Sequence, residues 1–167
     1  MPHSMLVLKL MIPVKDWPLF SADMRVTDAI KLLRIITEEK KLEHGHSTPL
    51  VVDENYNLIG FVHLVDLLKS IRHLYEGTGA PSGPLEEPTA VVNDLVVTFA
   101  GSVTPDDPIL KALKIMMDHR VSLVPVMKDH KLYGIVKLSD IFNTVASLLF
   151  DKEIVSEREV LIRRFRL

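Results

Sequence analysis

Apolar and polar residues follow two different rhythms along this chain. In residues 107–116, apolar side chains recur at the spacing of a helix that an Asp-Pro pair can begin. Residues 121–127 and 132–136 are short apolar runs joined by a polar turn, which is typical of two adjacent strands. Helical spacing returns in residues 139–149, which predict a second amphipathic helix. The positions expected to face inward on these helices are Ile109, Ala112, Leu113, Met116, Ile141, Phe142, Val145, Leu148 and Leu149.

The first half of the chain shows the same order of elements. We expect a helix over 29–40, strands over 49–52 and 58–62, and a second helix over 66–74. Each half therefore predicts helix, strand, strand and helix after an extended lead-in. Residues 76–91 between the halves are rich in Gly, Pro and Ser, which predicts an exposed linker.

Matching motifs indicate that the two halves are copies of one unit. The segment GFVHLVD in the first half corresponds to GIVKLSD in the second, and further matches fall in the same order. Because chance does not preserve such an order, the sequence predicts a tandem repeat of units of roughly 60 residues. Two strands cannot bury a face alone, so we expect the copies to pack on each other. The matched segments include 14–17 with 92–95, 26–33 with 109–116, and 60–66 with 134–140.

The composition of the 167 residues narrows the classes of function. With 20 basic and 22 acidic residues the net charge is -2, so no overall positive field favours nucleic acid or anionic lipid. There is no Cys, which excludes disulfides and thiolate nucleophiles and fits a reducing compartment. No apolar run approaches the ~18 residues of a membrane span, and the opening is a poor signal peptide. We therefore expect a cytoplasmic globular protein with no membrane span and no nucleic-acid partner.

The order of these motifs resembles the cystathionine beta-synthase (CBS) domain, which occurs as tandem pairs called Bateman modules. The segment HRVSLVPVMKDHKLYGIVKLSDI carries the resemblance in the second copy, and TPLVVDENYNLIGFVHLVDLL carries it in the first. The resemblance implies an α+β fold in which two β-α-β-β-α repeats pack as a pseudo-two-fold pair with ligand clefts at their junction. The expected parts are an N-terminal extension (1–13), CBS repeat 1 (14–75), a linker (76–91), CBS repeat 2 (92–150) and a C-terminal tail (151–167).

The same resemblance implies a function. Such pairs commonly bind adenosine nucleotides or related adenosyl ligands, act as regulatory sensors and often assemble as dimers. No catalytic domain accompanies this pair, so we expect a stand-alone homodimer that signals to a separate, unknown regulated protein by a conformational shift. The adenosine nucleotide, AMP, ADP or ATP, is expected as a regulatory ligand, and no cofactor is required.

Two acids are the main candidates for ligand contacts. By the resemblance, the Asp six residues after the motif Gly binds the ribose hydroxyls, which nominates Asp66 and Asp140. A carboxylate suits this role because its two oxygens can accept both hydroxyls of a vicinal diol. An Asp in the first turn of a helix can instead satisfy free backbone N–H groups without any ligand. Both interpretations remain open for each Asp.

The position three residues after the motif Gly departs from the family pattern. Many members carry Ser or Thr there, whereas this chain has His63 and Lys137. These side chains could contact a phosphate or could fill the cleft. Further phosphate candidates are His46 and Arg120, whose unequal placement before the prolines predicts unequal clefts. The candidates for the adenine slot are Ser47, Thr48, Pro49, Val124 and Pro125.

Other classes of function have weaker support. No nucleophile, metal or phosphate-loop spacing appears, so we expect neither an enzyme nor a metal site, and His44 and His46 are interpreted as loop histidines. A dimerisation or interaction module with plugged clefts is the alternative to a nucleotide sensor. Residues 157–167 keep no single period, which leaves both helix and strand open for a tail that could contact a partner subunit.

Overall fold

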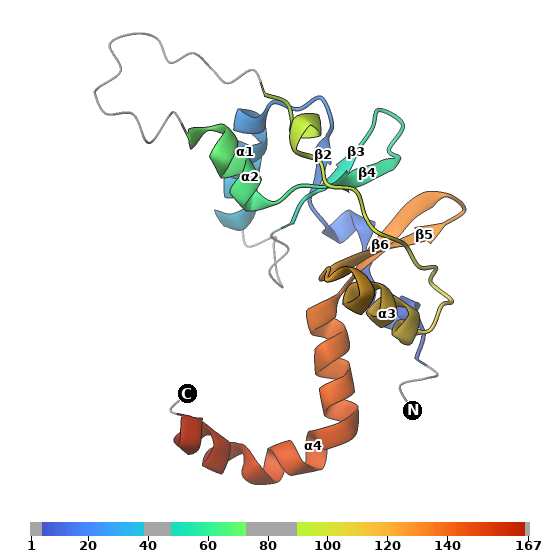
Figure 1. Cartoon of the computed structure of the whole chain (residues 1–167), viewed down its shortest axis with the longest axis vertical. Helices are drawn as coiled ribbons and strands as arrows, with labels where there is room; N and C mark the ends of the chain where they lie inside the picture. Colours follow the sequence, from blue (N-terminus) through green and yellow to red (C-terminus); the bar gives the residue numbers. More distant parts are fainter. Residues whose placement is uncertain (1–4, 39–47, 73–89, 166–167) are drawn as a thin grey trace. The chain divides into compact units, whose positions relative to one another are not determined.

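The computed structural model describes residues 5–38, 48–72 and 90–165 (Figure 1). It confirms the predicted fold class, with helices and two three-stranded sheets in a mixed α/β arrangement. The predicted contacts His46 and Ser47 lie outside the described residues, as does most of the predicted linker.

The chain forms two compact units. The first unit contains the described residues of Ile12–Ala100 together with Lys128–Gly134. The second unit contains the described residues of Met1–Met11, Gly101–Met127 and Ile135–Leu167. Each unit therefore combines one repeat with a segment that comes from outside that repeat in the sequence.

The first repeat has the predicted order of elements after an extended lead-in. It consists of β2 (Leu19–Ser21), α1 (Val26–Glu38), β3 (Leu50–Val52), β4 (Leu58–Phe61) and α2 (Leu64–Ser70). Strand β3 is central, parallel to β2 and antiparallel to β4. Because all three residues of β3 are buried, the strand is apolar throughout rather than alternating. The core of this unit is formed by Phe20, Val26, Ala29, Val51, Val62, Leu67 and Val92.

The second repeat has the same plan. Helix α3 (Ile109–His119) is followed by the hairpin of β5 (Leu123–Lys128) and β6 (Lys131–Lys137), and then by α4 (Leu138–Phe165). The short strand β1 (Ile12–Pro13) completes a sheet of order β1-β6-β5. A parallel bridge from Val103 to Val126 takes the place that β2 has in the first repeat. The core is formed by Val7, Val103, Ala112, Met116, Val124, Val126, Val136 and Ile141.

The lead-in segments are the elements that each unit takes from outside its repeat. The 3-10 turn η2 (Val7–Lys9) precedes the first repeat, yet Val7 lies fully buried in the core with Val103 and Ala112. The turn η5 (Val92–Leu95) is the lead-in that opens the second repeat, yet Val92 is fully buried in the core of the first. Each repeat thus completes its core with the lead-in of the other.

Backbone hydrogen bonds fix which lead-in residues are equivalent. Val7 N donates to Asp107 O at 2.8 Å, and Val92 N donates to Met24 O at 2.8 Å. The next residue in each turn bonds two positions further back, to Pro105 O and Ala22 O. Val7 therefore corresponds to Val92. The predicted match of 14–17 with 92–95 was therefore wrong. The sequence of η3 (Val14–Asp16) resembles that of η5, but the backbone hydrogen bonds equivalent to those of η5 are made by η2, which lies earlier in the chain.

Helix α4 differs most from the prediction. It begins at Leu138 and continues through the predicted tail to Phe165, so the tail forms a helix rather than a strand. Ile141 is buried and Val145 packs against the core, as predicted. Phe142 is 67% exposed and Leu149 is 59% exposed, and Leu148 is exposed as well, so their inward placement was wrong. Within α4, Ile141 and Val145 are the residues that pack against the core of the second unit. The helix then continues beyond this core to Phe165.

Candidate ligand site

The two acids predicted to bind a ligand occupy equivalent backbone positions. Asp66 is the third residue of α2, and Asp140 is the third residue of α4. Each helix follows closely on the last strand of its repeat, so the strand end determines where the carboxylate emerges. Both side chains are about one-third exposed, at 31% and 30%. Each carboxylate is therefore held by a regular element and accessible to solvent.

The observed partner of each carboxylate is a lysine side chain. Lys69 Nζ lies 3.2 Å from Asp66 Oδ1, and Lys137 Nζ lies 3.7 Å from Asp140 Oδ1. A capping acid has a different geometry, in which a carboxylate oxygen accepts a backbone N–H. Asp107 shows a related contact, because its Oδ2 accepts the backbone N–H of Thr104, a residue before helix α3, at 2.7 Å. Within the described part of the chain, the contacts of Asp66 and Asp140 thus differ from those of a capping acid.

The two lysines are held very differently. Lys69 lies one turn along α2 and is 68% exposed, so its ion pair is screened by water and can be displaced at little cost. Lys137 is the last residue of β6 and is only 12% exposed. The second acid therefore has a largely buried cation beside it, whereas the first has an exposed one.

A groove lies beside the first acid, within the first unit. Its volume is about 460 Å³, which is in the range of small-molecule sites. Its apolar lining is Leu95, the last residue of η5, and Val96, which follows it. Its polar lining comes from one side of α2 and from Asp94 of η5. Sequence reasoning missed the lead-in residues, although the run VNDLVV already placed apolar groups next to an acid. The lining residues are Asp66, Lys69, Ser70, Asp94, Leu95 and Val96.

His63 precedes α2 as its N-cap residue, in an extended backbone conformation. Its ring meets Phe61 edge-on, with the ring centroids 5.0 Å apart and the planes at 89°. The residue is exposed. His63 therefore lies at the surface, directly before the helix that carries Asp66.

The first proline strand has most of its polar backbone groups engaged. Thr48 O accepts a hydrogen bond from Trp17 Nε1 at 2.9 Å, and Pro49 O accepts one from Val62 N at 3.0 Å. Pro49 is buried and Thr48 is partly buried. Each of these two carbonyls therefore already accepts one hydrogen bond within the fold.

The second proline strand is buried more deeply. Val124 is fully buried in the core, and Pro125 is buried beside it. Pro125 O accepts a hydrogen bond from Val103 N at 3.0 Å. Val124 and Pro125 therefore have a structural role in the contacts that they make here.

Arg120 ends helix α3. It adopts the left-handed conformation, with φ 53° and ψ 42°, and its backbone N–H donates to Met116 O. This conformation is usually taken by Gly at a helix end, so an exposed Arg there carries some backbone strain. The structure places its side chain at the surface of the second unit after α3, and its backbone has a clear structural role.

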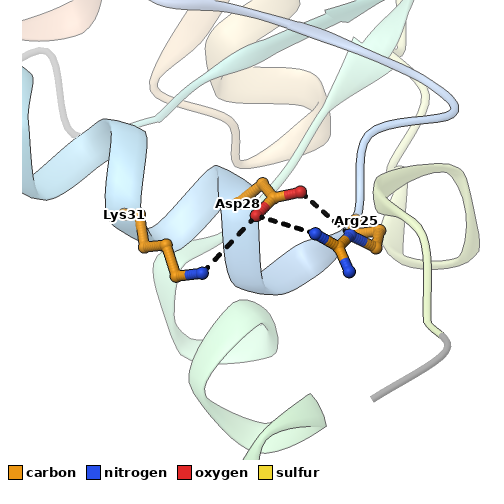
Figure 2. Close-up of polar contacts among 3 residues, drawn as sticks. All are labelled: Arg25, Asp28 and Lys31. Atoms are coloured by element: carbon orange, nitrogen blue, oxygen red, sulfur yellow. Dashed lines mark hydrogen bonds and ion pairs between the residues drawn. The ribbon is translucent and has the colours of Figure 1, made fainter. Parts of the chain in front are cut away.

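None of the described carboxyl groups with a lowered pKa belongs to the candidate site; they are Asp28, Asp53, Asp107 and Asp118. Figure 2 shows Asp28 between Arg25 and Lys31 at the start of α1. The hydrogen bond that Arg25 Nε donates to Asp28 Oδ2 at 2.9 Å lowers the pKa of Asp28, and Lys31 Nζ at 3.7 Å adds to the effect. All three residues stabilise the first turn of a helix, which is an ordinary role for such a cluster.

The described residues contain neither a cluster of metal ligands nor a membrane-spanning helix. Across residues 5–38, 48–72 and 90–165, no three His, Cys, Asp or Glu side chains gather as a possible metal site. No described helix is long and apolar enough to cross a membrane.

The repeated β-α-β-β-α fold, with an acid at the same helix start in each copy, defines a tandem-repeat module of two α+β units. The CBS domain model matches residues 10–73 and 92–147, and the chain belongs to this family. The recognition of a tandem CBS pair from sequence is therefore confirmed.

The chain is similar to several proteins of the same kind. It is 27% identical over 132 residues to the CBS domain-containing protein CBSX3, mitochondrial, of Arabidopsis thaliana, covering 78% of this chain and 57% of that relative. The chain thus spans little more than half the length of this relative. Among solved structures, CBSX2 in complex with AMP matches with a TM-score of 0.60 at 22% identity, covering 86% of this chain and 97% of that one. The cytosolic domain of the Mg²⁺ channel MgtE in complex with ATP matches with a TM-score of 0.64 at 21% identity, covering 83% and 48%.

Proposed function

We propose that this protein is a regulatory sensor that binds an adenosine nucleotide, AMP, ADP, ATP or a related adenosyl ligand, at Asp66 and Asp140. The observation that carries the proposal is the repeated, partly exposed carboxylate at the start of a helix in each repeat. Such a carboxylate accepts both hydroxyls of a ribose through charge-assisted hydrogen bonds. Two proteins with the same fold, CBSX2 and MgtE, were solved in complex with AMP and ATP, which supports the choice of ligand.

The phosphates would be bound by the basic residues near each acid. In the second repeat, Lys137 Nζ lies 3.7 Å from Asp140 Oδ1, so one nucleotide could place its ribose on the carboxylate and a phosphate on the ammonium. In the first repeat, the surface residue His63 has the equivalent position. His46 and Arg120 are further proposed phosphate contacts. The proposed adenine slots are formed by Ser47, Thr48, Pro49, Val124 and Pro125.

Isothermal titration of the purified chain with AMP, ADP, ATP, adenosine and GTP tests the proposal. We expect binding of adenosine ligands but not of GTP, weakened at least about tenfold by Asp66→Asn or Asp140→Asn, because a neutral amide loses charge-assisted bonds. Asp118→Asn is the matched control, since Asp118 pairs with Lys114 on an exposed face of α3. If none of the nucleotides binds to protein freed of co-purified ligand, the sensor proposal is wrong.

One observation favours the alternative of an interaction module with plugged sites. Lys137 is largely buried and lies beside Asp140, so it could occupy the space that a ribose needs. Lys137→Ala separates the two functions. The sensor proposal expects this variant to bind ATP more weakly than the original chain. The alternative expects a variant that binds adenosine ligands while the original chain binds none.

The remaining parts of the proposal concern the cellular role. We expect a non-catalytic homodimer with CBS repeats at 14–75 and 92–150, which shifts conformation on binding and so changes its affinity for a regulated protein. We expect the cytoplasm as its location, and microscopy of the full natural protein with a C-terminal tag would test this. Because the relative CBSX3 is a mitochondrial protein, a mitochondrial signal is the informative contrary result.

A further inference from the structure

The groove beside Asp66 carries more acidic than basic side chains. Two of its lining residues are acids, Asp66 and Asp94, and Lys69 is the single basic one among the described residues that line it. With both carboxylates and the ammonium ionised near neutral pH, the described lining has a net charge of -1. A nucleotide would bring further negative charge into this groove. The uncharged lining residues are Ser70, Leu95 and Val96.

Asp94 is held in place by the turn to which it belongs. Its Oδ2 accepts the backbone N–H of Val91 at 3.1 Å, and a carboxylate has further acceptor capacity on its second oxygen. The turn η5 is itself docked on the first unit, because Val92 is fully buried in the core and its N–H donates to Met24 O at 2.8 Å. The fold therefore places the charge of Asp94 on one wall of the groove.

The lysine of the groove is already paired with the other acid. Lys69 Nζ lies 3.2 Å from Asp66 Oδ1, so the charge of Asp94 has no counter-charge among the described lining residues. Ser70 Oγ donates to Leu67 O at 2.8 Å, and its hydroxyl hydrogen is therefore not available to a phosphate. The side chains of the described lining thus offer mainly hydrogen-bond acceptors to a ligand.

A lining of this kind favours ligands with many donors and little negative charge. Ribose hydroxyls donate hydrogen bonds and carboxylates accept them, so a nucleoside suits the groove. A triphosphate carries several negative charges near neutral pH. In a ligand that fills the groove, these charges lie within one Debye length of Asp94, about 8 Å at physiological ionic strength. Like charges at this range repel each other, whereas adenosine has no charge and AMP has a single phosphate.

We propose that Asp94 makes the first site selective for adenosyl ligands of low charge, so that adenosine and AMP bind there more tightly than ATP. Asp94 determines specificity by repelling the additional phosphates, while Asp66 accepts the ribose hydroxyls. This inference rests on the proposed function, because it takes Asp66 as the ribose acceptor. It adds the class of ligand that the first site prefers and the residue that sets the preference.

Isothermal titration of an Asp140→Asn chain tests the selectivity of the first site, because the second acid is then neutral. Adenosine, AMP and ATP are titrated at low ionic strength and without divalent cations, which would neutralise the phosphates. We expect adenosine and AMP to bind at least about fivefold more tightly than ATP. The difference should shrink in about 1 M salt, where the Debye length falls to about 3 Å. ATP binding as tight as adenosine binding at low salt would overturn the selectivity.

Two substitutions in this chain should change the selectivity in opposite directions. Asp94→Asn removes a negative charge and keeps an oxygen that can accept the N–H of Val91. We expect it to lower the ratio of the ATP and adenosine dissociation constants at least about threefold. Lys69→Gln removes the positive charge and should raise the same ratio. Asp118→Asn, an equal change of charge on an exposed face of α3, is the control and should leave the ratio unchanged.

The ratio distinguishes a charge effect from a structural one. Damage to the groove would weaken adenosine and ATP binding together, whereas a loss of repulsion improves ATP binding selectively. An unchanged ratio in Asp94→Asn would overturn the role of Asp94.

Three outcomes separate this inference from the proposed function. If ligands bind the Asp140→Asn chain with no dependence on their charge, the selectivity is wrong and the sensor stands. If the original chain binds the ligands and the Asp140→Asn chain binds none, the selectivity is again wrong, and the sensor rests on its second site. If neither chain binds any of the three ligands, the sensor and the selectivity are both wrong.

Discussion

Asp66 and Asp140 stand at the same place in two copies of one motif, yet their surroundings differ. Asp66 borders a groove of about 460 Å³ and has an exposed lysine partner on its own helix. Asp140 has a lysine partner at the end of the preceding strand, and that lysine is only 12% exposed. One acid has a counter-charge that is exposed to solvent, whereas the other has a counter-charge that is largely buried.

The difference shows which features of the repeat are tied to the fold. The third position of the helix is set by where the preceding strand ends, so both copies keep an acid in the same place. The residue three after the motif Gly borders this position but is not needed for the core. This position holds His63 at the surface in one repeat and the largely buried Lys137 in the other. Equal backbones thus support two unequal sites.

The largest expected effect concerns the glycine that begins the first motif. A Cβ at Gly60 would collide with the carbonyl oxygen of Val97, which accepts a hydrogen bond from Phe61 N at 2.9 Å. Because the obstacle is backbone, it cannot move aside as a side chain can. We expect Gly60→Ala to lower the free energy of unfolding by about 3 kcal/mol, measured by urea denaturation.

Gly101 offers a matched control for this substitution. A Cβ there would meet only the side chain of Ile115, at 3.5 Å, which is ordinary contact. We expect Gly101→Ala to change the unfolding free energy by less than about 1 kcal/mol. Equal losses at the two glycines would show that the close crossing at Val97 does not position the strand that leads to Asp66.

The second expected effect tests the exchange of lead-ins. Val7 and Val92 are both fully buried, each in the core of the repeat that does not follow it in sequence. We expect Val7→Ala and Val92→Ala each to cost about 2 kcal/mol in thermal or urea unfolding. Val65→Ala, at an exposed position of α2, is the control and should cost less than about 0.5 kcal/mol. A large loss for Val92→Ala alone would break the equivalence of the two repeats.

The order of elements could be predicted from sequence because hydrophobic period and motif order are local properties. The helix stripe of Ile109, Ala112 and Met116 is buried as its spacing predicts. The exchange of lead-ins could not be predicted, because Val7 and Val92 contact residues far away in the chain. Likewise, Leu148 and Leu149 follow the helical spacing of residues 139–149, but spacing alone does not reveal where the core that α4 packs against ends.

The candidate site was predictable in its acids and less so in their setting. Asp66 and Asp140 followed from the repeated motif, and their equivalent positions depend on local helix geometry. The groove beside Asp66 also needs Leu95 and Val96 from the other lead-in, which only the tertiary structure brings close. Sequence predicted Lys137 near the site but could not show that it is mostly buried, because burial depends on neighbours from other elements.

A third expected effect measures how far the two lysines differ. Removing Lys137 leaves the partly exposed Asp140 without its held cation, so we expect Lys137→Ala to lower the unfolding free energy by about 1 kcal/mol. Lys69→Ala removes an exposed and screened pair and should cost less than about 0.5 kcal/mol. Urea unfolding without nucleotide is the measurement. Indistinguishable values would mean that burial of Lys137 does not make the second site different.

The smallest expected effect concerns the starts of α1 and α3, where the repeats also differ. Partial burial acts to raise the pKa of Asp107, but hydrogen bonds from Lys111 Nζ and Thr104 N outweigh it and hold the pKa below its ordinary value of 3.8. The pKa of Asp28 is also lowered, chiefly by the hydrogen bond from Arg25. A carboxyl with a lowered folded-state pKa stabilises the fold above its unfolded value, and this contribution is lost as pH falls through the folded value.

We therefore expect the unfolding free energy to fall between about pH 4 and pH 2, and Asp107→Asn to remove part of this dependence. Asp28→Asn should remove less, because its ion pairs are exposed to solvent and screened by salt. Urea unfolding at a series of pH values, at low and high salt, separates the two. Asp28→Asn could instead reduce the pH dependence of the unfolding free energy more than Asp107→Asn does. The hydrogen bond from Thr104 N to Asp107 would then not contribute more to stability than the ion pairs of Asp28. The start of α3 would then depend on screened charge in the same way as the start of α1.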